Sequence, residues 1–102
     1  MKHTVTMPAW VKVEIDAFKD IRSDEKLARI TASLKVDRGI TQVMFHLPGS
    51  GRKAWITHFN GGKRRNDWSV TKAYSEDALH SDNTIRGLKR SEAVEQAIWH
   101  LI

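Results

Sequence analysis

The basic side chains between residues 52 and 72 have the composition and arrangement of an anion-binding site. Two stretches, PGSGRK at 48–53 and GGKRRN at 61–66, combine glycines with cations. Glycines let successive backbone N–H groups converge on an anion, and lysine and arginine add Coulombic attraction. The phosphate contacts that this pattern predicts are Lys53, Lys63, Arg64, Arg65 and Lys72, with Arg52 in a supporting role.

The positive charge of the chain is concentrated in its middle third. Residues 39–75 hold six lysines and arginines against one acid, Asp67, and the net charge of the whole chain is +5. Such a stretch attracts polyanions, among them DNA, RNA and acidic proteins. The alternative is that the cations only keep two hairpin turns soluble, because charged turns are ordinary.

Aromatic residues accompany these cations. Trp55, Trp68 and Tyr74, together with Phe59, lie within the basic third of the chain. Aromatic rings on a basic sheet can stack against the bases of a single strand. The alternative is that they form the core beneath the helices, since large aromatics dominate small cores. In that case the core candidates of the sheet are Val43, Phe45, Trp55, Phe59, Trp68, Val70 and Tyr74.

Catalytic and metal-binding patterns are weak in this sequence. His46 and His58 fall on segments expected to be neighbouring strands, and such a pair could hold a metal with a third ligand. Asp67 is the one carboxylate of the middle third, and no hydrolase motif is present. We therefore predict no catalytic residue, no metal site and no cofactor.

Length and composition favour a single domain at 1–102. The 102 residues fall within the common size range of domains, and 40% of them are hydrophobic. The chain has no cysteine, which fits a reducing cytoplasm. No apolar run reaches the roughly 18 residues that cross a membrane, so we expect a cytoplasmic protein without a membrane partner.

The first part of the chain predicts a short strand and two helices. Residues 2–7 alternate as a strand would. Residues 9–18 have the helical period, with Val11, Ile15 and Phe18 as the apolar stripe, although part of this segment also alternates, and we favour the helix. Residues 23–38 are interpreted as a second helix that Ser23 caps and Gly39 ends. Its buried stripe would be Leu27, Ile30 and Leu34.

The centre and the end of the chain predict a sheet followed by a helix. Residues 40–47, 53–60 and 67–75 are rich in β-branched and aromatic residues and are separated by turn residues. A short edge strand near 84–88 and a final helix over 91–102 complete the order. The predicted fold class is α+β: a three-stranded antiparallel meander packed with two N-terminal helices and one C-terminal helix, with a fourth, N-terminal strand as an open alternative.

The order β–α–α–β–β–β–α in a small basic chain resembles the ribosome-dependent ribonuclease toxins of the RelE/ParE superfamily. That resemblance implies a sheet whose basic and aromatic residues bind or cleave RNA, or in the ParE branch act on gyrase. The residues that it would bring together are Lys53, His58, Arg64, Arg65, Lys72 and Tyr74. Separately, the run from DWSVTKAY to GLKRSEAVEQAI is similar to the sheet-then-helix end of double-stranded-RNA-binding and integrase arm-type domains.

These observations predict a small basic protein that binds nucleic acid, DNA or RNA, mainly through the phosphate backbone. One alternative is a toxin-like ribonuclease, as the superfamily resemblance implies. Another alternative is an inhibitor from a phage or mobile element that docks on an acidic protein partner. Binding is favoured over catalysis, because no residue pattern specifies a reaction.

Overall fold

The computed structural model describes residues 3–59, 67–74 and 83–102 of the chain. Within those ranges it has six strands, two α-helices and one short 3-10 helix. In chain order these are β1 (His3–Thr6), α1 (Ala9–Phe18), η1 (Glu25–Arg29), β2 (Thr31–Asp37), β3 (Ile40–His46), β4 (Lys53–Phe59), β5 (Trp68–Ala73), β6 (Asn83–Leu88) and α2 (Arg90–Leu101). None of the helices in these ranges is long and apolar enough to cross a membrane.

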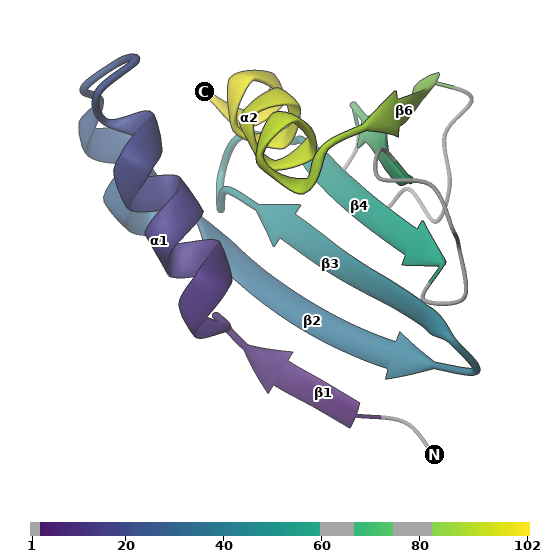
Figure 1. Cartoon of the computed structure of the whole chain (residues 1–102). Helices are drawn as coiled ribbons and strands as arrows, with labels where there is room; N and C mark the ends of the chain where they lie inside the picture. Colours follow the sequence, from purple (N-terminus) through teal and green to yellow (C-terminus); the bar gives the residue numbers. More distant parts are fainter. Residues whose placement is uncertain (1–2, 60–66, 75–82) are drawn as a thin grey trace.

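The six strands form one antiparallel sheet in which strands that follow each other in sequence are also neighbours in space, from β1 at one edge to β6 at the other. Figure 1 shows α1 and α2 side by side on the same face of this sheet, and the two helices contact each other. The molecule therefore has one layer of helices and one layer of strands. The α+β class is confirmed, but the expected three-stranded meander with three helices is wrong.

Residues 23–38 account for most of this difference. The helical prediction relied on apolar residues at Leu27, Ile30 and Leu34, yet only Glu25–Arg29 is helical and the rest of the segment is β2. Strand β2 forms ladders with both β1 and β3. These long-range backbone hydrogen bonds outweigh a helical preference of a few tenths of a kcal/mol per residue.

The connection between β2 and β3 is a two-residue hairpin turn. Arg38 and Gly39 have positive φ angles, 53° and 78°, and they lie between the paired residues Asp37 and Ile40. Positive φ at both central residues is the type I′ geometry, whose twist matches that of the flanking strands. Gly39 therefore reverses a strand rather than ending a helix. The observed order is β–α–β–β–β–β–β–α, so the order that suggested the RelE/ParE resemblance does not occur.

The remaining elements follow the sequence pattern. Helix α1 is confirmed, and it buries Val11, Ile15 and Phe18, the predicted stripe. The edge strand predicted near residues 84–88 is confirmed as β6, and the N-terminal strand, left as an alternative, is present as β1 at the other edge of the sheet. Helix α2 is confirmed but starts at Arg90, and the Glu92 carboxylate accepts a hydrogen bond of 3.0 Å from the Lys89 N–H just before it.

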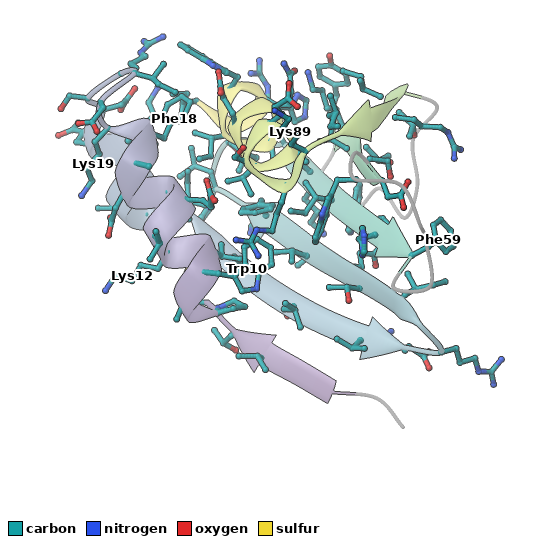
Figure 2. The ribbon with its side chains drawn as sticks, in the orientation of Figure 1. Trp10, Lys12, Phe18, Lys19, Phe59 and Lys89 are labelled. Carbon is teal, nitrogen blue, oxygen red and sulfur yellow. The ribbon has the colours of Figure 1, made fainter. Side chains whose placement is uncertain are left out.

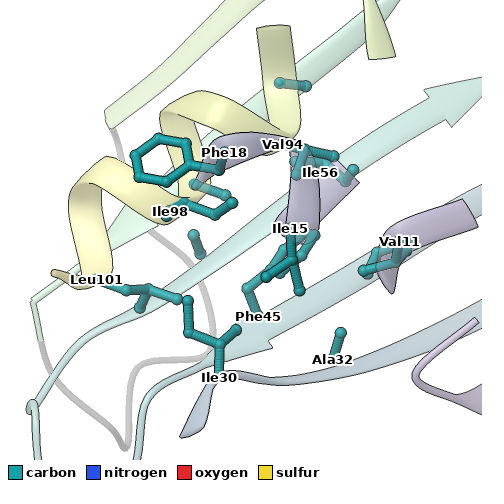
Figure 3. Packing of buried hydrophobic residues seen from close by; sticks show 14 of the residues in the cluster. Val11, Ile15, Phe18, Ile30, Ala32, Phe45, Ile56, Val94, Ile98 and Leu101 are labelled. Atoms are coloured by element: carbon teal, nitrogen blue, oxygen red, sulfur yellow. The ribbon is translucent and has the colours of Figure 1, made fainter. Parts of the chain in front are cut away.

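The hydrophobic core lies between the helix layer and the sheet, as Figure 3 shows. Its largest fully buried side chains are Phe45, Ile56, Ile98, Val11, Val43, Val70 and Val94. Three strand residues predicted for the core, Val43, Phe45 and Val70, are confirmed, and Trp68 packs against it from the same side. The same prediction is wrong for three other aromatics: Phe59 is 56% exposed, Tyr74 is 66% exposed, and Trp55 points away from the helices.

Candidate nucleic-acid interface

The sheet has a second face, opposite the helices, which we call the open face. Successive side chains of a strand point to opposite faces, so the residues beside the buried Phe45, Ile56 and Val70 belong to it. Strand pairing arranges them in rows, and the central row is Ser33, Met44, Trp55, Thr71 and Thr84. One flanking row is Lys35, Gln42, Thr57 and Ser69, and the next row outward on that side is Asp37, Ile40 and Phe59. The flanking row on the other side of the central row is Thr31, His46 and Lys53. Both helices of the described ranges lie on the other face.

Strand β4 runs through the middle of the open face. Lys53, Trp55, Thr57 and Phe59 point to this face, while the intervening Ala54 and Ile56 are buried beneath the helices. The aromatic residues of β4 lie about 13 Å apart along the strand, because four residues rise by about 3.3 Å each. Figure 2 shows Phe59 at the end of β4, away from both helices. The strand therefore presents one cation and two aromatic rings in a line.

Hydrogen-bonding side chains surround these rings. Thr71 and Thr84 continue the row of Trp55, and their hydroxyl oxygens are 3.0 Å apart. In the flanking row that contains both residues, Gln42 donates from Nε2 to the Thr57 hydroxyl at 3.5 Å. Each of these groups has further donors or acceptors beyond the bond it makes. The open face thus combines apolar rings with polar groups, a mixture that suits the faces and edges of nucleobases.

Trp68, which the sequence offered as a stacking residue, lies on the helix side of the sheet. Its ring packs edge-on against Trp10 at 5.8 Å and stacks on His58 at 4.9 Å. The Arg90 guanidinium covers the Trp10 ring at 4.5 Å from its centroid. These contacts occupy Trp68 within the packing between helices and sheet, on the face opposite Trp55.

Tyr74 lies just beyond β5 with its ring exposed. It meets His100 of α2 edge-on, with ring centroids 4.8 Å apart. His100 is buried, and its Nε2 lies 2.7 Å from the Ala73 carbonyl oxygen. Burial lowers the pKa of His100, and the charges of Arg52 and Lys72 act in the same direction, whereas the hydrogen bond to Ala73 acts against them. Tyr74 is therefore separated from the open face and belongs to the junction of β5 with α2.

The predicted phosphate contacts are not gathered in one place. Lys53 lies on the open face, in the row of His46. Lys72 points to the helix side, where its Nζ donates to Gln96 Oε1 of α2 at 3.1 Å. Arg52 donates from Nη1 to the His100 carbonyl oxygen at 3.2 Å, near the end of α2. The other three predicted contacts, Lys63, Arg64 and Arg65, lie outside the described residues.

Hydrogen bonds within the β3–β4 turn occupy two of its backbone N–H groups. The Ser50 N–H donates to the Leu47 carbonyl oxygen at 3.0 Å, and the Arg52 N–H donates to the Ser50 hydroxyl at 3.1 Å. The Ser50 hydroxyl in turn donates to Leu47 at 2.6 Å. The Ser50 and Arg52 N–H groups are therefore bonded within the turn.

The two central histidines are on opposite faces of the sheet. His46 shares the open face with Lys53, whereas His58 stacks on Trp68 beneath the helix layer. Over residues 3–59, 67–74 and 83–102, no group of three or more histidine, aspartate or glutamate side chains could hold a metal ion. The arrangement of these histidines thus offers no shared ligand set.

The sequence contains a signal that separates the stacking and core alternatives for Phe59, because Phe59 has the same strand parity as the polar residues Lys53 and Thr57. Lys26 and Arg29 are not among the residues that the sequence predicts for the site, yet they line one pocket together with Arg52. Arg29 and Arg52 are 23 positions apart in the sequence, so no local spacing could have indicated this cluster.

Comparisons of this chain with protein-family models, with curated proteins and with solved structures found no match. The function therefore has to be argued from the geometry of the open face.

Proposed function

We propose that this protein binds a nucleic-acid strand along β4, with bases stacked on Trp55 and Phe59 and phosphates near Lys53. The proposal rests on one observation: these three side chains share a face of the sheet that lies opposite both described helices. A single strand is favoured over a duplex, because only unpaired bases can reach an aromatic ring face to face. Unpaired bases of DNA and of RNA both offer a flat face to these rings, so both are tested.

The charge of the middle third supports the same proposal. Residues 39–75 carry six basic residues and one acid, and β4 lies at their centre. Lys63, Arg64 and Arg65 follow β4 in the sequence, and their phosphate contacts remain a prediction from the sequence. We expect the protein to act in the cytoplasm, since a chain without cysteine suits a reducing compartment.

Fluorescence anisotropy with a short labelled oligonucleotide tests this proposal directly. Single-stranded DNA, single-stranded RNA and a duplex of the same sequence are titrated at about 50 and about 200 mM salt. If Lys53, Lys63, Arg64 and Arg65 each neutralise one phosphate, affinity for the single strand should fall about 50-fold between these salt concentrations. The Trp55→Ala variant should bind about 5-fold to 150-fold more weakly, which corresponds to a stacking contribution of about 1–3 kcal/mol per base.

The chain provides a matched control for Trp55. Trp99 is 39% exposed on α2, in the helix layer, so Trp99→Ala should leave the affinity close to that of the wild type. A second readout is intrinsic fluorescence, because Trp55 is the tryptophan on the open face while Trp10, Trp68 and Trp99 lie in or beside the helix layer. Oligonucleotide should quench the wild type, and the quenching should disappear in Trp55→Phe although anisotropy still reports binding. Equal affinities of wild type and Trp55→Ala, or quenching that persists in Trp55→Phe, would refute the proposal.

An acidic protein partner is the second candidate, because the open face also has the composition of a protein interface. Met44, Trp55 and Phe59 are apolar, and Lys35 and Lys53 lie among the polar residues around them. Aromatic and methionine residues are enriched at interface centres. This candidate predicts a complex that survives nuclease treatment and that Trp55→Ala disrupts. We do not propose the ribonuclease alternative, because the element order that suggested it is absent.

A further inference from the structure

A second basic feature lies at the end of the molecule where η1, the β3–β4 turn and the end of α2 meet, close to the C-terminus in Figure 1. These segments surround a cavity of about 420 Å³, which we call the end pocket, and its lining includes Lys26, Arg29 and Arg52. Sites for small molecules commonly measure about 300–1,000 Å³, so the end pocket can admit a group larger than a bare ion.

Two of the three cations are held in position by α2. Lys26 donates from Nζ to the Ile102 main-chain oxygen at 3.4 Å, and Arg52 donates from Nη1 to the His100 carbonyl oxygen at 3.2 Å. On η1, the Lys26 N–H donates to the Asp24 carboxylate at 2.9 Å, which fixes the start of that turn of helix. The end of α2 therefore orients both side chains before any ligand arrives.

The charge of the end pocket is not balanced by acidic side chains. Within the described ranges, no aspartate or glutamate lines the pocket or forms an ion pair with Lys26, Arg29 or Arg52. The main-chain oxygens at the end of α2 offset these three positive charges only in part. Lysine has three N–H donors and arginine five, so donors remain after the bonds to α2. This surplus suits a compact dianion.

A phosphate group fits these donors better than a carboxylate does. The backbone N–H groups of Ser50 and Arg52 are bonded within the turn, and the charged donors that line the pocket are the side chains of Lys26, Arg29 and Arg52. Arginine presents a planar fork that binds phosphate oxygens in pairs, and lysine adds a point charge. A phosphate monoester carries close to two negative charges at neutral pH, whereas a carboxylate carries one. The free volume leaves room for the group to which the phosphate is attached.

We propose that the end pocket binds a phosphate monoester, and that in the complex this group is the terminal phosphate of the bound strand. The source of the phosphate rests on the function proposed above, whereas the pocket itself does not. Lys53 connects the two sites, because it points to the open face and directly follows Arg52 of the end pocket. A nucleic-acid strand that leaves the open face at Lys53 reaches the end pocket by passing around the end of the sheet at which the β3–β4 turn lies.

The test compares oligonucleotides of one sequence that end in a hydroxyl, a 5′-phosphate or a 3′-phosphate. Arg29→Gln is the variant of choice, because Arg29 is exposed and takes part in none of the hydrogen bonds or ion pairs found among the described residues. Arg38→Gln is the matched control, since Arg38 is exposed in the β2–β3 turn at the opposite end of β3. We expect one phosphorylated form to bind wild type about tenfold more tightly than the hydroxyl form, as charge-assisted hydrogen bonds do. Arg29→Gln should abolish this preference and Arg38→Gln should keep it.

Inorganic phosphate alone provides the second arm, measured as a shift of the melting temperature. If the three oligonucleotides bind wild type equally while Trp55→Ala weakens them all, the end-pocket inference is wrong and the proposed function stands. If no oligonucleotide binds, but phosphate stabilises wild type and not Arg29→Gln, the pocket holds a free phosphate and the proposed function is wrong. A preference for phosphate that persists in Arg29→Gln, or equal stabilisation of both proteins, would overturn the inference.

Discussion

The burial of His100 predicts that this protein loses stability below neutral pH. The side chain is only 7% exposed, and its Nε2 lies 2.7 Å from the Ala73 carbonyl oxygen. A carbonyl only accepts, so Nε2 carries the proton of the neutral ring and a second proton would have to bind at Nδ1. Burial lowers the pKa of His100, and the positive charges of Arg52 and Lys72 lower it further.

The sign of the pH dependence follows from this direction. In the unfolded chain a histidine binds a proton below about pH 6.5, whereas folded His100 binds it only at lower pH. Between those two pKa values the unfolded state holds more protons, so the free energy of unfolding falls as the pH decreases. Above the unfolded value this contribution is fully present. One proton corresponds to a slope of at most about 1.4 kcal/mol per pH unit.

Urea unfolding of wild type and His100→Gln from about pH 8 to pH 5 measures this slope. Glutamine retains an N–H donor for Ala73 but does not titrate. The wild type should lose more stability than His100→Gln on acidification, by up to about 1.4 kcal/mol per pH unit. His46→Gln, a change on the open face, shows whether loss of any histidine has the same effect. Identical slopes for wild type and His100→Gln would refute the reasoning about His100.

Two further predictions separate the faces of the sheet and test the basic segment. In a thermal or urea melt, Phe45→Ala should lower the free energy of unfolding by about 3–5 kcal/mol, because Phe45 is fully buried. Phe59→Ala should lower it by less than about 1 kcal/mol, because Phe59 is exposed. Equal losses of stability in the two variants would contradict the assignment of the two faces. Replacement of Lys63, Arg64 and Arg65 by alanine should weaken single-strand binding and reduce the log–log salt slope by about 2, as anisotropy would show. An unchanged slope would mean that these cations contact no phosphate.

The elements with a strong local pattern could be predicted from the sequence. Helix α1 follows from Val11, Ile15 and Phe18, and β3 follows from the alternation that buries Val43 and Phe45. Both patterns arise within a single element, because a helix repeats every 3.6 residues and a strand every two. For the same reason, the sequence of β4 shows that Trp55 and Phe59 lie on the same face as Lys53. It does not show whether that face is covered by the helices.

Residues 23–38 show where local reasoning fails. Leu27, Ile30 and Leu34 fit a helix, while Ile30, Ala32, Leu34 and Val36 fit a strand equally well. The pairing of β2 with β1 and β3 decides between them, and it depends on segments elsewhere in the chain. The hydrogen bonds and side-chain contacts that stabilise a strand are made with other strands, which lie elsewhere in the sequence. The sequence of one strand alone therefore does not show whether these contacts form.

The α+β class, the stripe of α1, the alternation of the central strands and the surplus of positive charge in residues 39–75 follow from the amino-acid sequence alone. The orientation of Trp68 toward the helices and of Trp55 away from them depends on the tertiary structure, because the helices could cover either side of the sheet. The meeting of Lys26 and Arg29 with Arg52 at the end pocket depends on it too, since these residues come from η1 and from the β3–β4 turn. Local periodicity follows from the covalent geometry of a short segment, whereas the choice of face and the meeting of distant cations follow from how the whole chain buries its apolar surface.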